Sequence, residues 1–141
     1  MIWLAQKKDL EQIDVLCRQF SEASHFVKYK PDVFRRTWES LIDSGFGVLL
    51  VQDDFHGMLG AMAYPDPNSG ETIATEMFWW VDPQHRGKGQ ELLSAYEQWA
   101  SAVGATKAIM VHLSDSMPER LKMLYKRKGY SEMETHYVKD L

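Results

Sequence analysis

A short apolar strand pattern, Met77–Val81, leads into a turn that contains Gly87 and Gly89, and a long amphipathic helix pattern follows. The two glycines stand two positions apart between strand and helix, so the backbone can turn tightly there and leave its amides exposed. Amides at the start of a helix lie at the positive end of its dipole and can hold phosphate. The run Val81–Gly89 therefore predicts an anion-binding cradle at a strand–helix junction.

Apolar periodicity, with proline and glycine as punctuation, divides the rest of the chain into strands and helices. Strands are expected over residues 1–5, 48–52, 58–64, 72–81, 107–113 and 130–141. Helices are expected from Asp9, the N-cap, to Ser24, from Pro31 to Gly45, from Leu92 to Val103 and from Pro118 to Gly129. This order, β-α-α-β-β-β-α-β-α-β, predicts an α/β (α+β) mixed sheet with helices on both faces, in one domain spanning residues 1–141.

Composition restricts the classes of protein to consider. The 141 residues are 45% hydrophobic and 26% charged, as in an ordinary globular protein. A net charge of −4 argues against nucleic-acid binding, which usually needs a basic face. A single cysteine, Cys17, excludes an internal disulfide and favours a cytoplasmic location. No apolar stretch approaches the roughly 20 residues of a membrane span, and no signal peptide is apparent.

Two nucleotide-binding loops also contain closely spaced glycines, and the residues around Gly87 argue against both. A Walker A loop ends in Gly-Lys-Ser/Thr, whereas Gly87-Lys88 is followed by Gly89, which has no hydroxyl for magnesium. A dinucleotide-binding fingerprint needs a third glycine at the position of Leu92. Neither loop explains the cradle.

A third reading comes from a family resemblance. The spacing Gln84-x-x-Gly87-x-Gly89 matches the Gln/Arg-x-x-Gly-x-Gly/Ala signature of the GCN5-related N-acetyltransferases, the GNAT superfamily. The segment Phe78–Pro83 resembles the family's fourth strand, and Leu124–Tyr130 resembles its Leu-Tyr-x-x-x-Gly-Phe/Tyr element. The expected element order is also the family's order, so the resemblance covers essentially the whole chain. It implies the GNAT acyl-CoA N-acyltransferase fold.

The resemblance implies that the cradle binds the pyrophosphate of acetyl-CoA and that pantetheine lies between the splayed fourth and fifth strands. Many members carry an asparagine at the position that Pro118 occupies here, and Ser116 and Ser114 are the candidates to replace its contact with the cofactor. The residues expected to bind the cofactor are Trp79, Trp80, Val81, Arg86, Gly87, Lys88, Gly89, Gln90 and Ser116.

Two residues are candidates for proton transfer. An amine with a pKa of about 10.4 is mostly protonated at neutral pH, so a base must take its proton before it attacks. Glu76, the one carboxylate within residues 72–81, is the candidate base, although a bulge would change the face to which it points. Tyr125, which matches the family's tyrosine, is the candidate acid for the CoA thiolate. Alternatively, Glu76 is exposed or structurally paired, and Tyr125 packs beside Leu121.

The function that these expectations describe is an N-acetyltransferase in which a primary amine attacks acetyl-CoA directly in a ternary complex, without a metal. The acceptor is a small molecule or a peptide, shaped in many members by the region of Phe26, Tyr29 and Phe34, and a homodimer is left open. The alternative is a GNAT-fold protein that binds acyl-CoA or a partner without catalysis. The closing Glu134–Tyr137 also resembles small GNAT proteins encoded by tailed phages.

Overall fold

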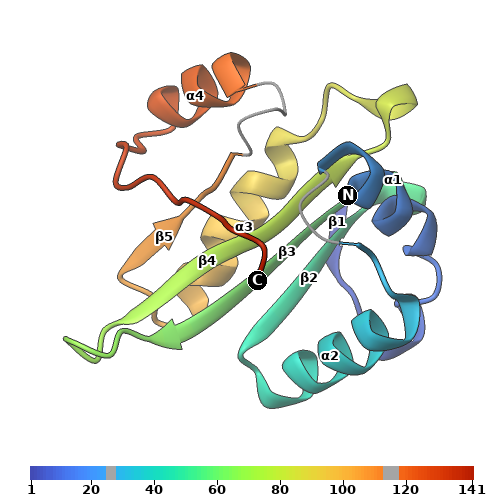
Figure 1. Cartoon of the computed structure of the whole chain (residues 1–141), viewed down its shortest axis with the longest axis horizontal. Coiled ribbons are helices and arrows are strands. Elements are labelled where there is room, and N and C mark those ends of the chain that lie inside the picture. The colour runs from blue at the N-terminus through green and yellow to red at the C-terminus, as the bar shows by residue number, and fades with distance from the viewer. Residues whose placement is uncertain (25–27, 113–117) are drawn as a thin grey trace. The chain divides into compact units, whose positions relative to one another are not determined.

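A five-stranded sheet carries the candidate cradle, and the strands lie in it in chain order (Figure 1). They are β1 (Ile2–Leu4), β2 (Gly47–Gln52), β3 (Gly57–Pro65), β4 (Thr72–Val81) and β5 (Lys107–Ile109). Neighbours from β1 to β4 are antiparallel, whereas β5 pairs with β4 in parallel. The computed structural model describes residues 1–24, 28–112 and 118–141 and divides the chain into two units, Met1–Val111 and His112–Leu141.

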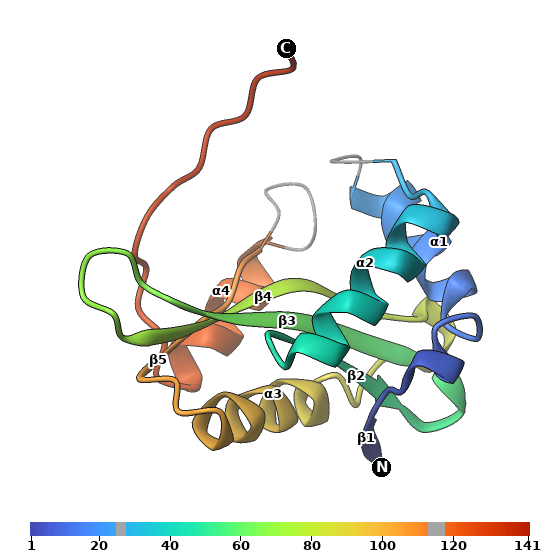
Figure 2. The ribbon, with the colours of Figure 1, turned by 90° about the horizontal axis from the view of Figure 1, so that it is seen from below.

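In the first unit, helices cover both faces of the sheet, as the sequence predicts. The helices are α1 (Asp14–Ser24), α2 (Pro31–Ser44) and α3 (Gln90–Ala102), with short 3-10 turns η1 (Lys7–Asp9), η2 (Asp53–Phe55) and η3 (Pro83–His85). Figure 2 shows α1 and α2 on one side of the sheet and α3 on the other. The second unit contains α4 (Pro118–Arg127), followed by an irregular C-terminal segment.

Aromatic packing holds α1 and α2 to their face of the sheet. The Phe78 ring of β4 lies 5.3 Å from Trp38, 6.0 Å from Phe34 and 6.1 Å from Phe20, measured between ring centroids. Gly60 on β3 makes room for this ring, because a Cβ there would lie 2.6 Å from Phe78 Cε1. A side chain at this position would therefore displace the central ring of the cluster.

On the other face, α3 buries the apolar stripe that the helical spacing predicts. Leu92, Leu93 and Tyr96 are fully buried, and Ala100 is 4% exposed. The Tyr96 hydroxyl donates a 2.9 Å hydrogen bond to the carbonyl of Ile109, which ties α3 to β5. This contact satisfies the buried hydroxyl of Tyr96.

The strand β4 contains a bulge at Met77. Gly60 pairs with Phe78 and the next residue, Ala61, pairs with Glu76, so Met77 has no partner on β3. Paired residues project to the same face of a sheet. Phe78 therefore lies on the face covered by α1 and α2, whereas Glu76 lies on the face covered by α3.

The first helix begins later than the sequence predicts. α1 begins at Asp14, so Asp9 is not its N-cap but the last residue of η1. The Asp9 carboxylate accepts a 2.8 Å hydrogen bond from the backbone N–H of Gln6. Leu10 and Ile13 precede the helix and are still buried, at 3% and 0% exposure. Their burial in irregular backbone produces the same apolar spacing as one more helical turn.

The strand predicted over residues 130–141 is wrong. Residues 130–141 have no regular secondary structure, and Tyr137 and Val138 are 94% and 76% exposed. A strand needs a partner for its backbone hydrogen bonds, and the second unit, in its described residues, contains no other strand. The fifth strand is also shorter than predicted: it ends at Ile109, and Leu113 lies outside the described residues.

Other predicted boundaries are confirmed. β4 spans Thr72–Val81, α2 begins at Pro31, and Gly45 ends α2 with φ +78° in the left-handed region that favours glycine. Across residues 1–24, 28–112 and 118–141, the helices are all too short or too polar to cross a bilayer.

Candidate active site

The chain leaves β4 through a capped turn. The Asp82 carboxylate accepts a 3.0 Å hydrogen bond from the backbone N–H of Gln84. The backbone N–H of His85 donates a 2.8 Å hydrogen bond to the Asp82 carbonyl. The hydrogen bond from the Gln84 backbone N–H stabilises the charged carboxylate and is the main reason that the pKa of Asp82 is lowered from its ordinary value. The ionised Asp82 side chain therefore fixes the turn that precedes the glycines.

The glycine-containing segment presents its amides to open space. Gly87 has φ +122°, a conformation that only glycine adopts readily, and nothing lies within 4 Å of the place where its Cβ would be. Gly89 is the N-cap of α3 and supplies no side-chain cap. In the part of the chain that the structure describes, the backbone N–H groups of residues 87–90 have no hydrogen-bond acceptor. These amides at a helix N-terminus form a site for an anion.

The two cationic side chains of the cradle differ in how they are held. Arg86 Nε donates 3.3 Å to the Val81 carbonyl, and its guanidinium lies 4.9 Å from the centroid of the Trp80 ring. Lys88 is exposed and forms no ion pair with any described residue. Arg86 is thus oriented by β4, while Lys88 can reach toward an anion.

A glutamine that sequence reasoning missed ties α1 to this junction. Gln19 Oε1 accepts a 2.9 Å hydrogen bond from Trp80 Nε1, and the Gln19 side chain also bonds the Asp82 carboxylate. One amide therefore joins α1, the end of β4 and the capped turn. A single polar residue on a helical pattern gives no sequence signal for such a bridge.

β4 and β5 separate just before the cradle. Their pairing covers only Ile73–Thr75 with Lys107–Ile109. The β5 side of residues 76–81 has no strand partner among the described residues, and the Val81 carbonyl accepts the hydrogen bond from Arg86 Nε instead. The side chains of Trp79, Trp80 and Val81 are half-buried.

Glu76 lies where the two strands diverge. Its side chain is 7% exposed, and its carboxylate accepts a hydrogen bond from the backbone N–H of Val111. Burial raises the pKa of Glu76 to about 8, and the Val111 hydrogen bond opposes this only in part. A carboxyl with this pKa can exchange a proton near neutral pH. Glu76 is thus a buried glutamate with a raised pKa, and the bulge at Met77 decides the face of the sheet on which its side chain lies.

Tyr125 belongs to the second unit. It is 8% exposed, and its ring centroid lies 5.7 Å from that of Tyr130 and 6.5 Å from that of His112. Gly129, with φ +90°, turns the chain so that the Tyr130 amide donates 2.9 Å to the Tyr125 carbonyl. The pairing of Tyr125 with Glu76 in one site stays a prediction.

Three candidates of the sequence, Ser114, Ser116 and Phe26, lie outside the described residues. Within the described ranges, no group of three or more His, Cys, Asp or Glu side chains is arranged so that it could hold a metal ion.

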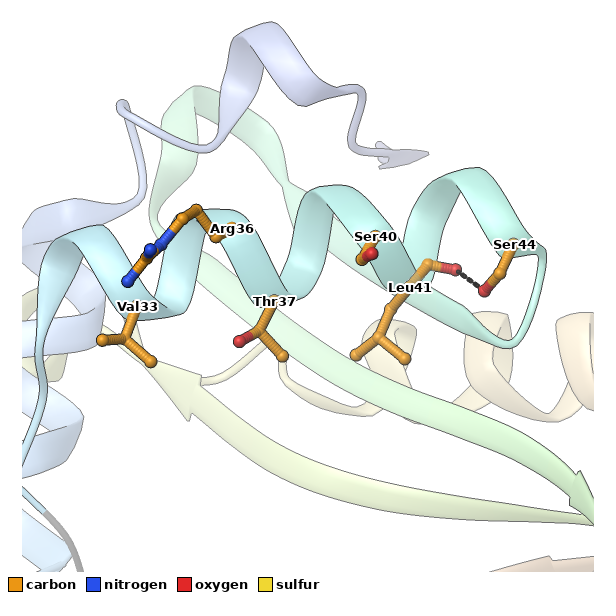
Figure 3. A pocket seen from close by; sticks show the side chains of 6 residues that line it. All are labelled: Val33, Arg36, Thr37, Ser40, Leu41 and Ser44. Atoms are coloured by element: carbon orange, nitrogen blue, oxygen red, sulfur yellow. Dashed lines mark hydrogen bonds between the residues drawn. The ribbon is translucent and has the colours of Figure 1, made fainter.

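A hollow of about 580 Å³ lies away from the cradle, along α2 (Figure 3). It is lined by two rows of side chains on that helix: Val33, Thr37 and Leu41, and Arg36, Ser40 and Ser44. The Ser44 hydroxyl donates 3.0 Å to the Leu41 carbonyl. This lining contains no carboxylate, imidazole or thiol, so it offers no group for proton transfer near neutral pH.

The sequence match defines the class of protein. Residues 9–130 match the family described as the Acetyltransferase (GNAT) family. Because this match spans most of the chain, the protein belongs to the GNAT acetyltransferase family. The expected family and fold class are thereby confirmed. The comparison with curated proteins found no match.

Solved structures share the fold at low sequence identity. A ribosomal-protein-alanine N-acetyltransferase from Brucella melitensis biovar Abortus 2308 is 20% identical, covers 100% of this chain and 99% of its own, and has a TM-score of 0.75. A transcriptional regulator from Bacillus halodurans C-125 is 19% identical, with 100% and 99% coverage and a TM-score of 0.83. An aminoglycoside acetyltransferase from an uncultured soil metagenomic sample is 17% identical, with 100% and 97% coverage and a TM-score of 0.77.

Proposed function

We propose that this protein is an N-acetyltransferase that moves an acetyl group from acetyl-CoA to a primary amine. The observation that carries the proposal is the run of amides at residues 87–90, at the start of α3, which have no hydrogen-bond acceptor among the described residues. Family membership supports the transfer of an acetyl group. The family match runs through both units, which supports one domain over residues 1–141.

The cradle suits a diphosphate in charge and in shape. The amides of residues 87–90 and the dipole of α3 favour an anion, and Gly87 carries no side chain to keep it away. Lys88 and Arg86 add positive charge. In this proposal Gln90 contributes its amide, the strand segment Trp79–Val81 lies along pantetheine, and Ser116 keeps its expected cofactor contact.

Acetyl-CoA supplies the acetyl group as a thioester, and the protein manages two protons around the direct attack in a ternary complex. The amine nitrogen forms a bond to the acetyl carbon while the bond from that carbon to sulfur breaks. Glu76 takes the proton that the amine loses, and Tyr125 supplies a proton to the departing thiolate. With a pKa of about 8, Glu76 is ionised in roughly a tenth of molecules at pH 7, so its basic form increases as the pH rises.

The test is acetyl-CoA consumption against a panel of amines and peptides. The panel includes aminoglycosides and peptides with an N-terminal alanine, because two structural neighbours are named for such acceptors. Glu76→Gln and Tyr125→Phe should each lower kcat about a hundredfold, the order of one general acid or base. Glu22→Gln and Tyr137→Phe are matched controls at exposed positions and should retain full activity. Full activity of Glu76→Gln would exclude Glu76 as the base.

The second candidate function is binding of acyl-CoA without turnover. The orientation of Glu76 favours it, since the bulge turns this residue away from the face of Tyr29 and Phe34, the expected acceptor region. Calorimetric titration with CoA separates the two functions. Binding of CoA by a protein that acetylates no member of the panel would favour the binding function over the enzyme.

A further inference from the structure

We propose that Gln52 is a positioning residue that holds the cradle amides outward, an inference that rests on the proposed binding of acetyl-CoA. Gln52 is the last residue of β2 and is only 5% exposed. Its Nε2 donates a 3.2 Å hydrogen bond to the backbone carbonyl of Lys88, 36 residues further along the chain. The same carbonyl accepts a 3.1 Å hydrogen bond from the Glu91 amide in the first turn of α3, so Gln52 adds a link from the sheet to this turn.

The geometry of the peptide bond explains why this carbonyl matters. A trans peptide is planar, and its C=O and the N–H of the next residue point in opposite directions. The Lys88 carbonyl and the Gly89 N–H share one peptide. When Gln52 holds the carbonyl from the buried side, the Gly89 N–H must point away from the core, toward the place where an anion would lie.

The Gln52 side chain is a poor choice for stability alone. Its Oε1 is buried and has no hydrogen-bond partner among the described residues. An unsatisfied buried oxygen costs free energy that an apolar side chain of the same size avoids. The one contact that distinguishes Gln52 from such a side chain is the hydrogen bond to Lys88, which points to a role in the cradle and not in the core.

Gly57 makes room for this arrangement. It pairs with Gln52 across β2 and β3 and with Val81 across β3 and β4, so the three residues form a row that ends at the cradle. A Cβ on Gly57 would lie 2.6 Å from Gln52 Oε1 and 3.3 Å from Val81 Cγ2. Gly57→Ala would therefore displace the Gln52 amide while leaving its chemistry intact.

The experiment compares two ligands that share the thiol arm: CoA, which carries the diphosphate and the 3′-phosphorylated adenosine, and pantetheine, which carries neither. CoA binding is measured by calorimetric titration, and pantetheine binding by NMR titration. Gln52→Met, which has nearly the same shape but no donor, should weaken CoA binding about three- to tenfold, the range for one hydrogen bond. Pantetheine affinity should stay unchanged, and the melting temperature should stay equal or rise. Gly57→Ala should also weaken CoA binding selectively.

Val51→Ala is the matched control for lost stability. Val51 is fully buried and lies beside Gln52 on the opposite face of β2, so its truncation should lower the melting temperature without changing the affinity ratio of the two ligands. Equal CoA affinity of wild type and Gln52→Met, or an equal loss of affinity for CoA and pantetheine, would overturn the positioning role of Gln52. Either result would leave the proposed acetyltransferase function in place. Failure of the wild type to bind CoA would overturn the proposed function and this inference with it.

Discussion

Glu76→Gln should make this protein more resistant to denaturation as the pH rises toward 8, relative to the wild type. The folded wild type keeps the Glu76 proton up to a pKa of about 8, whereas the unfolded chain releases it near the ordinary value of 4.5. Between these two values the folded state binds more protons than the unfolded state. The free energy of unfolding therefore has its full contribution from Glu76 below pH 4.5 and loses it as the pH rises through 8.

The size of this loss follows from the two pKa values. With 4.5 unfolded and about 8 folded, the wild type loses roughly 3 kcal/mol between low pH and pH 7, and roughly 5 kcal/mol above pH 9. The glutamine side chain of the variant would stay neutral throughout and could still accept the Val111 hydrogen bond through its oxygen. Its buried NH₂ group adds a cost that does not depend on pH. The prediction therefore concerns the change with pH, not the absolute difference.

Urea denaturation of both proteins at pH 5, 6, 7 and 8 measures this change. The difference in unfolding free energy between Glu76→Gln and wild type should grow in favour of the variant, by about 2.5 kcal/mol from pH 5 to pH 7. Glu22→Gln, which removes an exposed carboxylate, corrects for the general loss of one negative charge. A difference that stays constant from pH 5 to pH 7 would refute the raised pKa of Glu76 and the role of burial in it.

Three further predictions concern activity, packing and thiol chemistry. If Glu76 is the base, kcat/KM corrected for ionisation of the acceptor amine should rise about tenfold from pH 6 to pH 7 and level off only above pH 8, and a flat profile would contradict this. Gly60→Ala should destabilise the protein by about 1–3 kcal/mol in urea denaturation because its methyl meets the Phe78 ring, and adding Phe78→Leu should recover part of the loss if that contact is the cause. Cys17 should react with Ellman's reagent only after unfolding, since burial raises its pKa to about 12, and rapid labelling of the folded protein would show that this thiol is accessible.

The conformation at the cradle could be predicted from the sequence because it depends on neighbouring residues. Gly87 adopts a positive φ, which glycine permits. β4 and α3 flank the turn, as the spacing of their apolar residues indicates. Pro31 and Gly45 mark the two ends of α2 for the same reason. In each case the residue type decides which backbone conformations that position can adopt, whatever the rest of the chain does.

The face of Glu76 could not be predicted, since the bulge at Met77 exists only in the pairing of β4 with β3. The space beneath Phe78 depends on Gly60, which stands 18 positions earlier in the chain. The apolar pattern predicts too early a start for α1, because Leu10 and Ile13 are buried in irregular backbone at the spacing of a helix. Residues 130–141 show the converse: their residue types permit a strand, but a strand also needs a partner.

The sequence by itself therefore determined the family, the order of most elements and the turn that exposes the cradle amides. Only the tertiary structure decided the direction of Glu76 and the hydrogen bond from Gln52 to the Lys88 carbonyl. The physical reason is the range of the interactions. Backbone preferences act within a few residues and are written in local residue types, whereas strand register, burial and the pKa shift that follows from it arise only when distant segments pack together.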